Sequence, residues 1–322
     1  MGTVVALGGQ VGGAKLAEGL YRLRGPKLTA IVNTGDDYEY LGLPVSPDVD
    51  TMLYALAGIA DANKGWEPVG ESYACHGMLT RLGGPAELPL GDRALALQLL
   101  RAEALRDERR PTEVTLELAQ RLGIEARVLP MSDDPVRTLV HTDSGTISFH
   151  DYFMDLKCEP AVRSFQYGGA HEARLSDEAL DALHAADLEA VVLLPCNPYH
   201  TLAPILAVPG MREALRKRGA PVVAVSPIIG GRALQGSAAK MMEELGREVS
   251  ARAVAMEYRG LIDGIVIDGA DEALAEGVRA SGFEVLCVPT FMRNAEDRLK
   301  LARAVLEFAR TVRTQREAAA DA

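Results

Sequence analysis

Short apolar runs recur along the chain and alternate with segments that have the spacing of amphipathic helices. The runs are residues 3–7, 28–32, 190–194, 221–225 and 264–267. Apolar residues three or four positions apart follow the first run at Leu16, Leu20 and Leu23, and helical patterns return at 211–217, 238–245, 270–280 and 295–312. This alternation predicts an α/β fold with a doubly wound, mostly parallel, Rossmann-like sheet.

The residues that directly follow the apolar runs are rich in glycine, asparagine and aspartate. In chain order the runs end in GGQVGG, NTGDD, PCNPYHT, SPIIGG and DGAD. Because ligands bind at the carboxyl ends of the strands in such sheets, we expect the functional site to be built from these segments.

The middle of the chain has a different pattern. Residues 61–123 carry helical spacing without a strong strand run, which predicts an inserted helical lobe beside a core of residues 1–60 and 124–322. Short strands are expected at 128–131, 136–141 and 146–149, with Asp143, Ser144 and Gly145 forming a hairpin turn. The small and charged residues after Thr311 are expected to fray.

Composition narrows the functional class. The 322 residues are 48% hydrophobic and 25% charged, as in globular proteins, and the net charge of −11 disfavours binding to nucleic acid. Four cysteines without metal-type spacing favour a reducing cytoplasm. No membrane association is expected, because no signal-peptide pattern begins the chain and four prolines interrupt the uncharged residues 190–211.

The segment GGQVGGAK offers flexible backbone amides where the first helix begins. Its candidate ligand-binding residues are Gly8, Gly9, Gly12, Gly13 and Lys15, which could cradle a phosphate or carboxylate. The segment matches neither the dinucleotide-binding pattern nor the P-loop pattern. A tight strand-to-helix turn without a ligand is the alternative interpretation.

Four acids, Asp36, Asp37, Asp48 and Asp50, follow the second apolar run within one loop-like segment. Hard oxygen ligands of this kind hold magnesium, which keeps several waters and binds substrate phosphates. The alternative is that Asp50 caps the helix that follows while Asp36 and Asp37 lie in a solvated turn. Four acids beside a glycine segment favour a metal site.

Two later segments are weaker candidates. Asn197 follows the third run and could recognise a base or sugar, although an ordinary proline-rich loop explains it equally well. Cys196 and His200 are not expected to form a catalytic pair, because a loop does not fix their geometry. Ser226, Gly230, Gly236 and Lys240 could bind a second anion or form a structural turn.

Taken together, these motifs resemble the 2-phospho-L-lactate transferases of coenzyme F-420 biosynthesis. The resemblance rests on GGQVGGAK, NTGDD with SPDVDT, the PM-x-DD segment, NP-x-x-T-x-x-PIL, and SPIIGG with a downstream G-x-A-x-K, in the same order over nearly the whole chain. It implies transfer of a phosphorylated acid from a guanosine diphosphate-linked donor to the ribityl hydroxyl of the deazaflavin Fo, with release of GMP. It also implies a magnesium cofactor, small-molecule partners, a cytoplasmic location and a homodimer.

The resemblance assigns roles to residues. It makes Asp37, Asp48 and Asp50 the metal ligands, and Asp36, Asp37 and Asp50 the catalytic acids, with Asp36 a partner or base. The glycine segment with Lys15 would line the phosphates. The remaining nucleotide or acceptor residues would be Asn197, Ser226, Gly230, Gly236 and Lys240, with Thr34 and Tyr54 near the acceptor.

The chain departs from the family pattern at four positions. Cys196, Glu67, Ala94 and Ser237 stand where serine, glycine, aspartate and often proline are usual. These departures leave the donor open among phospholactate, phosphoenolpyruvate and 3-phosphoglycerate derivatives. The alternatives in other classes are a nucleotide-sugar-binding regulatory protein without turnover, and a nicotinamide-dependent oxidoreductase, which the missing dinucleotide pattern disfavours.

Overall fold

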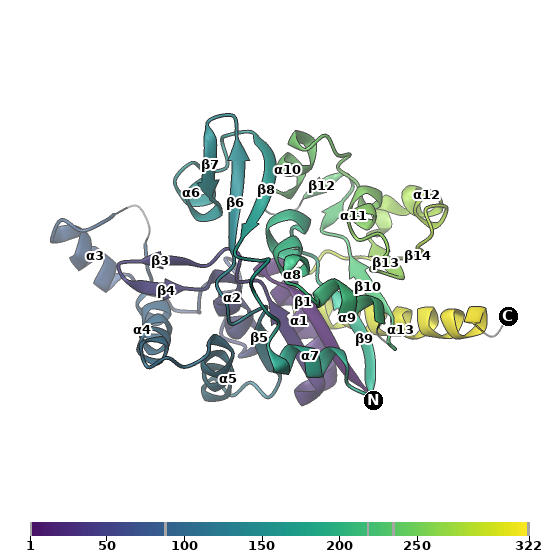
Figure 1. Cartoon of the computed structure of the whole chain (residues 1–322), viewed down its shortest axis with the longest axis horizontal. Coiled ribbons are helices and arrows are strands. Elements are labelled where there is room, and N and C mark those ends of the chain that lie inside the picture. The colour runs from purple at the N-terminus through teal and green to yellow at the C-terminus, as the bar shows by residue number, and fades with distance from the viewer. Residues whose placement is uncertain (1, 87–88, 218, 234–235, 321–322) are drawn as a thin grey trace.

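A computed structural model of the chain describes residues 2–86, 89–217, 219–233 and 236–320. Its centre is a seven-stranded parallel sheet with the order β14–β13–β10–β9–β1–β2–β5 (Figure 1). The strands are β1 Thr3–Gly8, β2 Leu28–Val32, β5 Arg127–Pro130, β9 Leu188–Leu193, β10 Val222–Val225, β13 Gly264–Ile267 and β14 Glu284–Cys287. The predicted doubly wound α/β fold is confirmed.

Alternating side chains of the strands pack into two apolar layers. In β1, Val5 and Leu7 face one layer, while Val4 and Ala6 face the other, and all four are at most 1% exposed. Because both faces of the sheet are covered, its central strands are continuous apolar runs, and this is why they were recognisable in the sequence.

Helices cover both faces of the sheet. One layer contains α1 Gln10–Arg24, α2 Pro47–Leu56 and α13 Ala295–Ala320. The other contains α7 Asp177–Leu183, α8 Ala203–Ala207, α9 Met211–Lys217, α10 Ala238–Glu244, α11 Ala251–Glu257 and α12 Ala275–Arg279. Among the helices described, none is both long and apolar enough to cross a membrane.

Three helices lie within the described part of residues 61–123, where a lobe is predicted. They are α3 Ala74–Arg81, α4 Asp92–Arg106 and α5 Pro111–Arg121. Figure 1 shows α3 and α4 beside the hairpin of β3 Tyr38–Tyr40 and β4 Leu43–Val45. Val114 and Leu118 of α5 join the apolar layer on the face of α1, so this end of the segment belongs to the cover of the sheet.

A small antiparallel sheet stands beyond the carboxyl ends of the central strands (Figure 1). Its strands are β6 Arg137–Thr142, β7 Gly145–Ser148 and β8 Val162–Gly168, with α6 Phe149–Met154 between the last two. Thr142 pairs with Gly145, which confirms the predicted hairpin turn at this position. Two further short strands, β11 Ile228–Ile229 and β12 Arg232–Ala233, form a hairpin after β10.

The expected fraying after Thr311 is wrong, because α13 continues to Ala320. Arg313 on this last part of the helix donates hydrogen bonds to the carbonyl oxygens of Leu188 and Glu189, at 2.7 and 3.0 Å. These bonds hold the helix against the beginning of β9.

Gly19 tests the packing of α1 on α13. A Cβ at this position would lie 2.3 Å from the backbone oxygen of Arg298, whereas a Cβ at Gly77 in α3 would meet nothing within 4 Å. We expect Gly19→Ala to lower the free energy of unfolding by about 1–3 kcal/mol through overpacking, and Gly77→Ala to raise it by about 0.5–1 kcal/mol. Urea denaturation checks both, and equal effects would contradict this account of the helix contact.

Candidate active site

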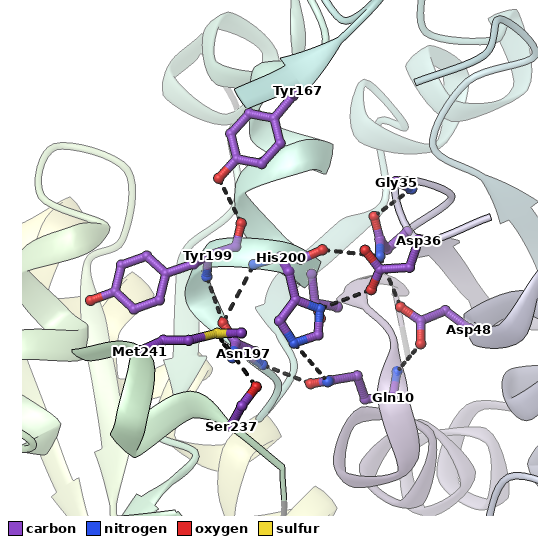
Figure 2. Close-up of polar contacts among 12 residues, drawn as sticks. Gln10, Gly35, Asp36, Asp48, Tyr167, Asn197, Tyr199, His200, Ser237 and Met241 are labelled. Carbon is purple, nitrogen blue, oxygen red and sulfur yellow. Dashed lines mark hydrogen bonds and ion pairs between the residues drawn. The ribbon is translucent and has the colours of Figure 1, made fainter. Parts of the chain in front are cut away.

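The candidate site lies where the order of the strands reverses. From β1 the chain proceeds to β2 and β5, whereas from β9 it proceeds to β10, β13 and β14 on the other side. The connections that follow the adjacent strands β1 and β9 therefore run to opposite sides of the sheet. α/β sheets bind ligands at such points. Three segments meet here, as Figure 2 shows: the glycine turn (residues 8–13), the acid loop (33–50) and the β9 loop (194–202).

The glycine turn is packed tightly between its neighbours. A Cβ at Gly9 would lie 2.2 Å from Asp48 Oδ2, and one at Gly12 would lie 2.6 Å from the backbone oxygen of Pro195. At Gly13 the nearest atom, Leu194 Cβ, is 3.3 Å away. These contacts explain the glycines by close packing of the turn itself, and anion binding by the turn stays a prediction.

Asp48 joins the glycine turn to the end of β2. Its Oδ1 accepts a hydrogen bond from the backbone N–H of Gln10 at 2.8 Å, and its Oδ2 accepts one from Asn33 Nδ2 at 3.0 Å. Gln10 begins α1, so the carboxylate also lies at the positive end of that helix. Burial raises the pKa of Asp48 to about 6, although these donors act in the opposite direction.

Asp36 and the β9 loop are connected through His200 (Figure 2). Asp36 Oδ2 lies 2.8 Å from His200 Nδ1, and His200 Nε2 lies 3.2 Å from Gln10 Nε2. The side-chain oxygen of Gln10 accepts a hydrogen bond from the backbone N–H of Asn197 at 2.9 Å. One continuous network therefore includes residues from all three segments.

Asp50 is paired with a cation from the helical segment. Arg101 of α4 binds Asp50 with two nitrogens, one of them 3.2 Å from Oδ2, and both side chains are buried. Burial lowers the pKa of Arg101, but the charge and hydrogen bonds of Asp50, together with Asp37 and Tyr54, leave that pKa raised. Ser46, not Asp50, is the N-terminal cap residue of α2, so the capping alternative for Asp50 is wrong.

Asp37 keeps one oxygen without a partner. Ser46 Oγ donates a hydrogen bond to its Oδ2 at 2.7 Å, whereas its Oδ1 is buried and has no hydrogen-bond partner in the described part of the chain. Burial raises the pKa of Asp37 to about 8, against the opposing effects of Ser46, Arg137 and Arg101. A buried carboxyl of this kind requires either a proton or a cation.

The carboxylates do not form a ready metal cage. Within the described residues, no group of three or more histidine, cysteine, aspartate or glutamate side chains is placed to hold a metal ion. Asp48 and Asp50 already use their oxygens for Gln10, Asn33 and Arg101. Buried oxygens without partners remain on Asp36, Asp37, Thr34 and Thr138. Mg²⁺ commonly uses only one or two protein carboxylates, so Asp37 fits such an ion.

The remaining candidates surround this centre in different ways. Asn197 is buried, and its Oδ1 accepts from the backbone N–H of Tyr199, which caps the π-helical turn Pro198–Leu202. Tyr54 is also buried, and burial raises its pKa. Lys15 is partly buried, and burial together with nearby Arg298 lowers its pKa.

The segment after β10 forms a turn of its own. Ser226 Oγ accepts from the backbone N–H of Ile228 at 3.1 Å, and Gly230 and Gly236 adopt φ angles of 57° and 76° that favour glycine. Lys240 binds Tyr152 Oη at 3.2 Å, Pro160 O at 3.1 Å and the carboxylate of Glu244. The structural-turn interpretation therefore accounts for this segment, and its anion binding stays a prediction.

Sequence reasoning missed several side chains that organise the site. Gln10 and Asn33 stood inside recognised motifs, but their polar side chains were not used. Arg101 had no signal, because a lone arginine on an amphipathic helix is ordinary. Cys196 is buried, and burial raises the pKa of its thiol, which disfavours the thiolate that a nucleophile requires.

Comparisons with known proteins agree with the motif-based resemblance. The family model described as 2-phospho-L-lactate transferase CofD matches residues 4–289. A phosphoenolpyruvate transferase from Kitasatospora aureofaciens is 38% identical over 318 residues, covering 96% of this chain and 98% of the relative. A 2-phospho-L-lactate transferase from Methanopyrus kandleri is 39% identical over 310 residues, covering 95% and 97%.

The fold also has a solved counterpart. A crystal structure of a UPF0052-family protein from Bacillus halodurans matches with a TM-score of 0.60 at 18% identity, over 95% of this chain and 98% of that one. This likeness concerns the fold alone.

The Asp50–Arg101 pair predicts a large cost when one partner is removed. Arg101→Ala leaves a buried carboxylate without its counter-charge, and we expect the free energy of unfolding to fall by about 3–5 kcal/mol. Arg110 is the control, because it pairs with carboxylates while its side chain is 44% exposed, and Arg110→Ala should cost far less than Arg101→Ala. Chemical denaturation measures both, and comparable losses would show that burial of the pair is unimportant.

Asp37→Asn tests the protonation of the buried carboxyl. With a pKa of about 8 in the folded protein and an ordinary value in the unfolded chain, Asp37 contributes stability at low pH and loses it as the pH rises from about 4 to 8. The asparagine variant lacks this loss. In buffers without divalent cations, we expect the stability of wild type relative to D37N to fall by up to about 1.4 kcal/mol per pH unit in this window. If the difference in stability between wild type and D37N did not change with pH, the raised pKa of Asp37 would be contradicted.

Proposed function

Because the chain belongs to the CofD family of 2-phospho-L-lactate transferases, we propose that it transfers a phospho-acid unit to the terminal ribityl hydroxyl of the deazaflavin Fo. The donor is a guanosine diphosphate-linked phospho-acid, and GMP is released. The observation that carries this proposal is the match over residues 4–289, together with buried carboxylate oxygens at the carboxyl edge of the sheet that have no partner among the described residues.

The chemistry is substitution at phosphorus. The hydroxyl oxygen of Fo forms a bond to the phosphorus that carries the acid, the bond from this phosphorus to the bridging oxygen breaks, and that oxygen leaves with GMP. The hydroxyl loses its proton in the process. Positioning of the two substrates and stabilisation of the charge on the phosphate oxygens supply most of the catalysis in such reactions.

We assign Asp37 as the protein ligand of Mg²⁺, since its Oδ1 is buried and has no partner in the described structure. When bound, Mg²⁺ would neutralise charge on the diphosphate. Asp48 and Asp50 hold the loops that carry Asp36 and Asp37 through their contacts with Gln10, Asn33 and Arg101. Because a carboxylate oxygen has a second lone pair, both acids stay candidate ligands beside Asp37.

The donor remains open among three phospho-acids. The relatives named above are called phosphoenolpyruvate and 2-phospho-L-lactate transferases, and their sequence identities to this chain are nearly equal.

The residues that depart from the family pattern make contacts of their own. Glu67 pairs with Lys64, Ser237 donates a hydrogen bond to Met241 Sδ, and Cys196 lies against the glycine turn. The backbone N–H of Ala94 donates to Glu71. A cytoplasmic location and a homodimer stay predictions.

Turnover with defined substrates tests the proposal. Purified protein is incubated with Mg²⁺, Fo and, separately, the phospholactyl, phosphoenolpyruvyl and 3-phosphoglyceryl guanosine diphosphate donors, and products are followed by mass. We expect a phospho-acid adduct of Fo with one donor, lost when EDTA is added. Tight nucleotide binding without product from any donor would overturn the transferase and favour a regulatory protein.

Asp37→Asn should separate binding from turnover. Removing the proposed metal ligand is expected to lower kcat at least about 100-fold while guanosine diphosphate binding remains measurable. Asp143→Asn serves as the control, because Asp143 lies in the exposed β6–β7 turn, where it pairs with Arg163. Unchanged activity of D37N at saturating Mg²⁺ would remove Asp37 from the metal site.

A further inference from the structure

His200 is an unusual residue to bury beside an acid loop. Its side chain is only 3% exposed and lies in the π-helical turn Pro198–Leu202 that follows β9. Phe149, the first residue of α6, stacks on its ring with centroids 4.0 Å apart and planes 18° from parallel. The ring is thus held in one plane, and neither of its nitrogens is left without a partner.

The hydrogen-bond network determines which nitrogen of His200 carries the proton. The backbone N–H of Asn197 can only donate, so the atom of Gln10 that faces it is the side-chain oxygen. The Gln10 amide nitrogen must then face His200 Nε2, which accepts a hydrogen bond from it. A histidine that accepts at Nε2 is neutral and carries its hydrogen on Nδ1.

This tautomer places a donor on Asp36. His200 Nδ1–H donates to Asp36 Oδ2 at 2.8 Å, as Figure 2 shows. The second oxygen of Asp36, Oδ1, is buried and has no partner within the described residues. One oxygen of this carboxylate is therefore anchored, while the other is fixed in orientation and free to accept a further hydrogen bond.

We propose that His200 is a positioning residue of the transfer reaction, which holds Asp36 so that its free oxygen accepts a hydrogen bond from the attacking hydroxyl of the acceptor. This inference rests on the proposed function. The chemical class it selects is an alcohol, because the unpartnered Oδ1 can accept a hydrogen bond and a hydroxyl can donate one. The hydroxyl oxygen is then oriented for attack on phosphorus.

The contact with Gln10 also suits a purely structural role for His200. Gln10 and Asn197 belong to the glycine turn and the β9 loop, so His200 also ties these segments together. If the role of His200 were purely structural, loss of its contact with Gln10 and loss of its contact with Asp36 would have equal effects. A positioning histidine would be needed chiefly for the bond from Nδ1 to Asp36.

Two substitutions separate these bonds. The amide nitrogen of asparagine occupies nearly the position of histidine Nδ1, and that of glutamine nearly the position of Nε2. We expect His200→Asn, which keeps a donor to Asp36, to lose less than about 5-fold in kcat. His200→Gln, which keeps only the contact to Gln10, should lose about 10–100-fold in kcat, with the KM for the donor changed less than about 3-fold. The exposed His171 provides His171→Gln as a control without effect.

Three outcomes are informative. Equal losses of kcat in H200N and H200Q, with parallel falls in melting temperature, would overturn the positioning role of His200. The proposed transferase activity would stand. Wild type without turnover on any of the three donors would overturn both proposals. Nitrogen-15 NMR of the histidine rings gives a readout that does not depend on activity: protonation of His200 at Nδ1 alone is expected, and a hydrogen on Nε2 would overturn the inference.

Discussion

The site depends on the burial of one carboxylate, Asp48, between loops that come from different strands. Parallel strands bring the origins of these loops together, but they do not fix the conformation of the loops. Asp48 does so by accepting from Gln10 at the start of α1 and from Asn33 at the end of β2, and Asn33 in turn donates to the carbonyl of His200. The amide donors and the positive end of α1 offset the cost of burying the charge.

A second buried charge connects the helical segment to the same loops. Asp50 faces Arg101 on α4, so an element distant in sequence supplies the counter-charge for the acid loop. The four acids of this loop thus divide into two kinds. The oxygens of Asp48 and Asp50 accept the hydrogen bonds that hold the loops. Asp36 and Asp37, in contrast, each keep a buried oxygen without a partner in the described structure. Spacing in the sequence does not reveal this division, because all four belong to one polar segment.

The sequence predicted six of the seven strands of the central sheet, because strands buried on both faces are continuous apolar runs. The edge strand β14 was missed, since only one of its four residues is buried. β8, Val162–Gly168, was also missed, since only Val162 is buried and the strand includes arginine, serine and glutamine. The tail of α13 was missed because its anchors, such as Arg313, bind backbone oxygens of β9, and no local pattern encodes such contacts. The candidate residues predicted at the strand ends do lie together there, but the partners of the acids depend on tertiary contacts.

The packing of the glycine turn affects how this protein and its relatives are recognised from sequence. Gly9 and Gly12 are required by the close approach of Asp48 and Pro195, before any ligand is considered. A search pattern built on these glycines would therefore collect chains that share the turn, including binders that catalyse nothing. A pattern that also demands Asp36, Asp37 and a hydrogen-bond donor from the β9 loop would select for the proposed chemistry. Functional assignment in this fold should give more weight to Asp36 and Asp37 than to the glycines.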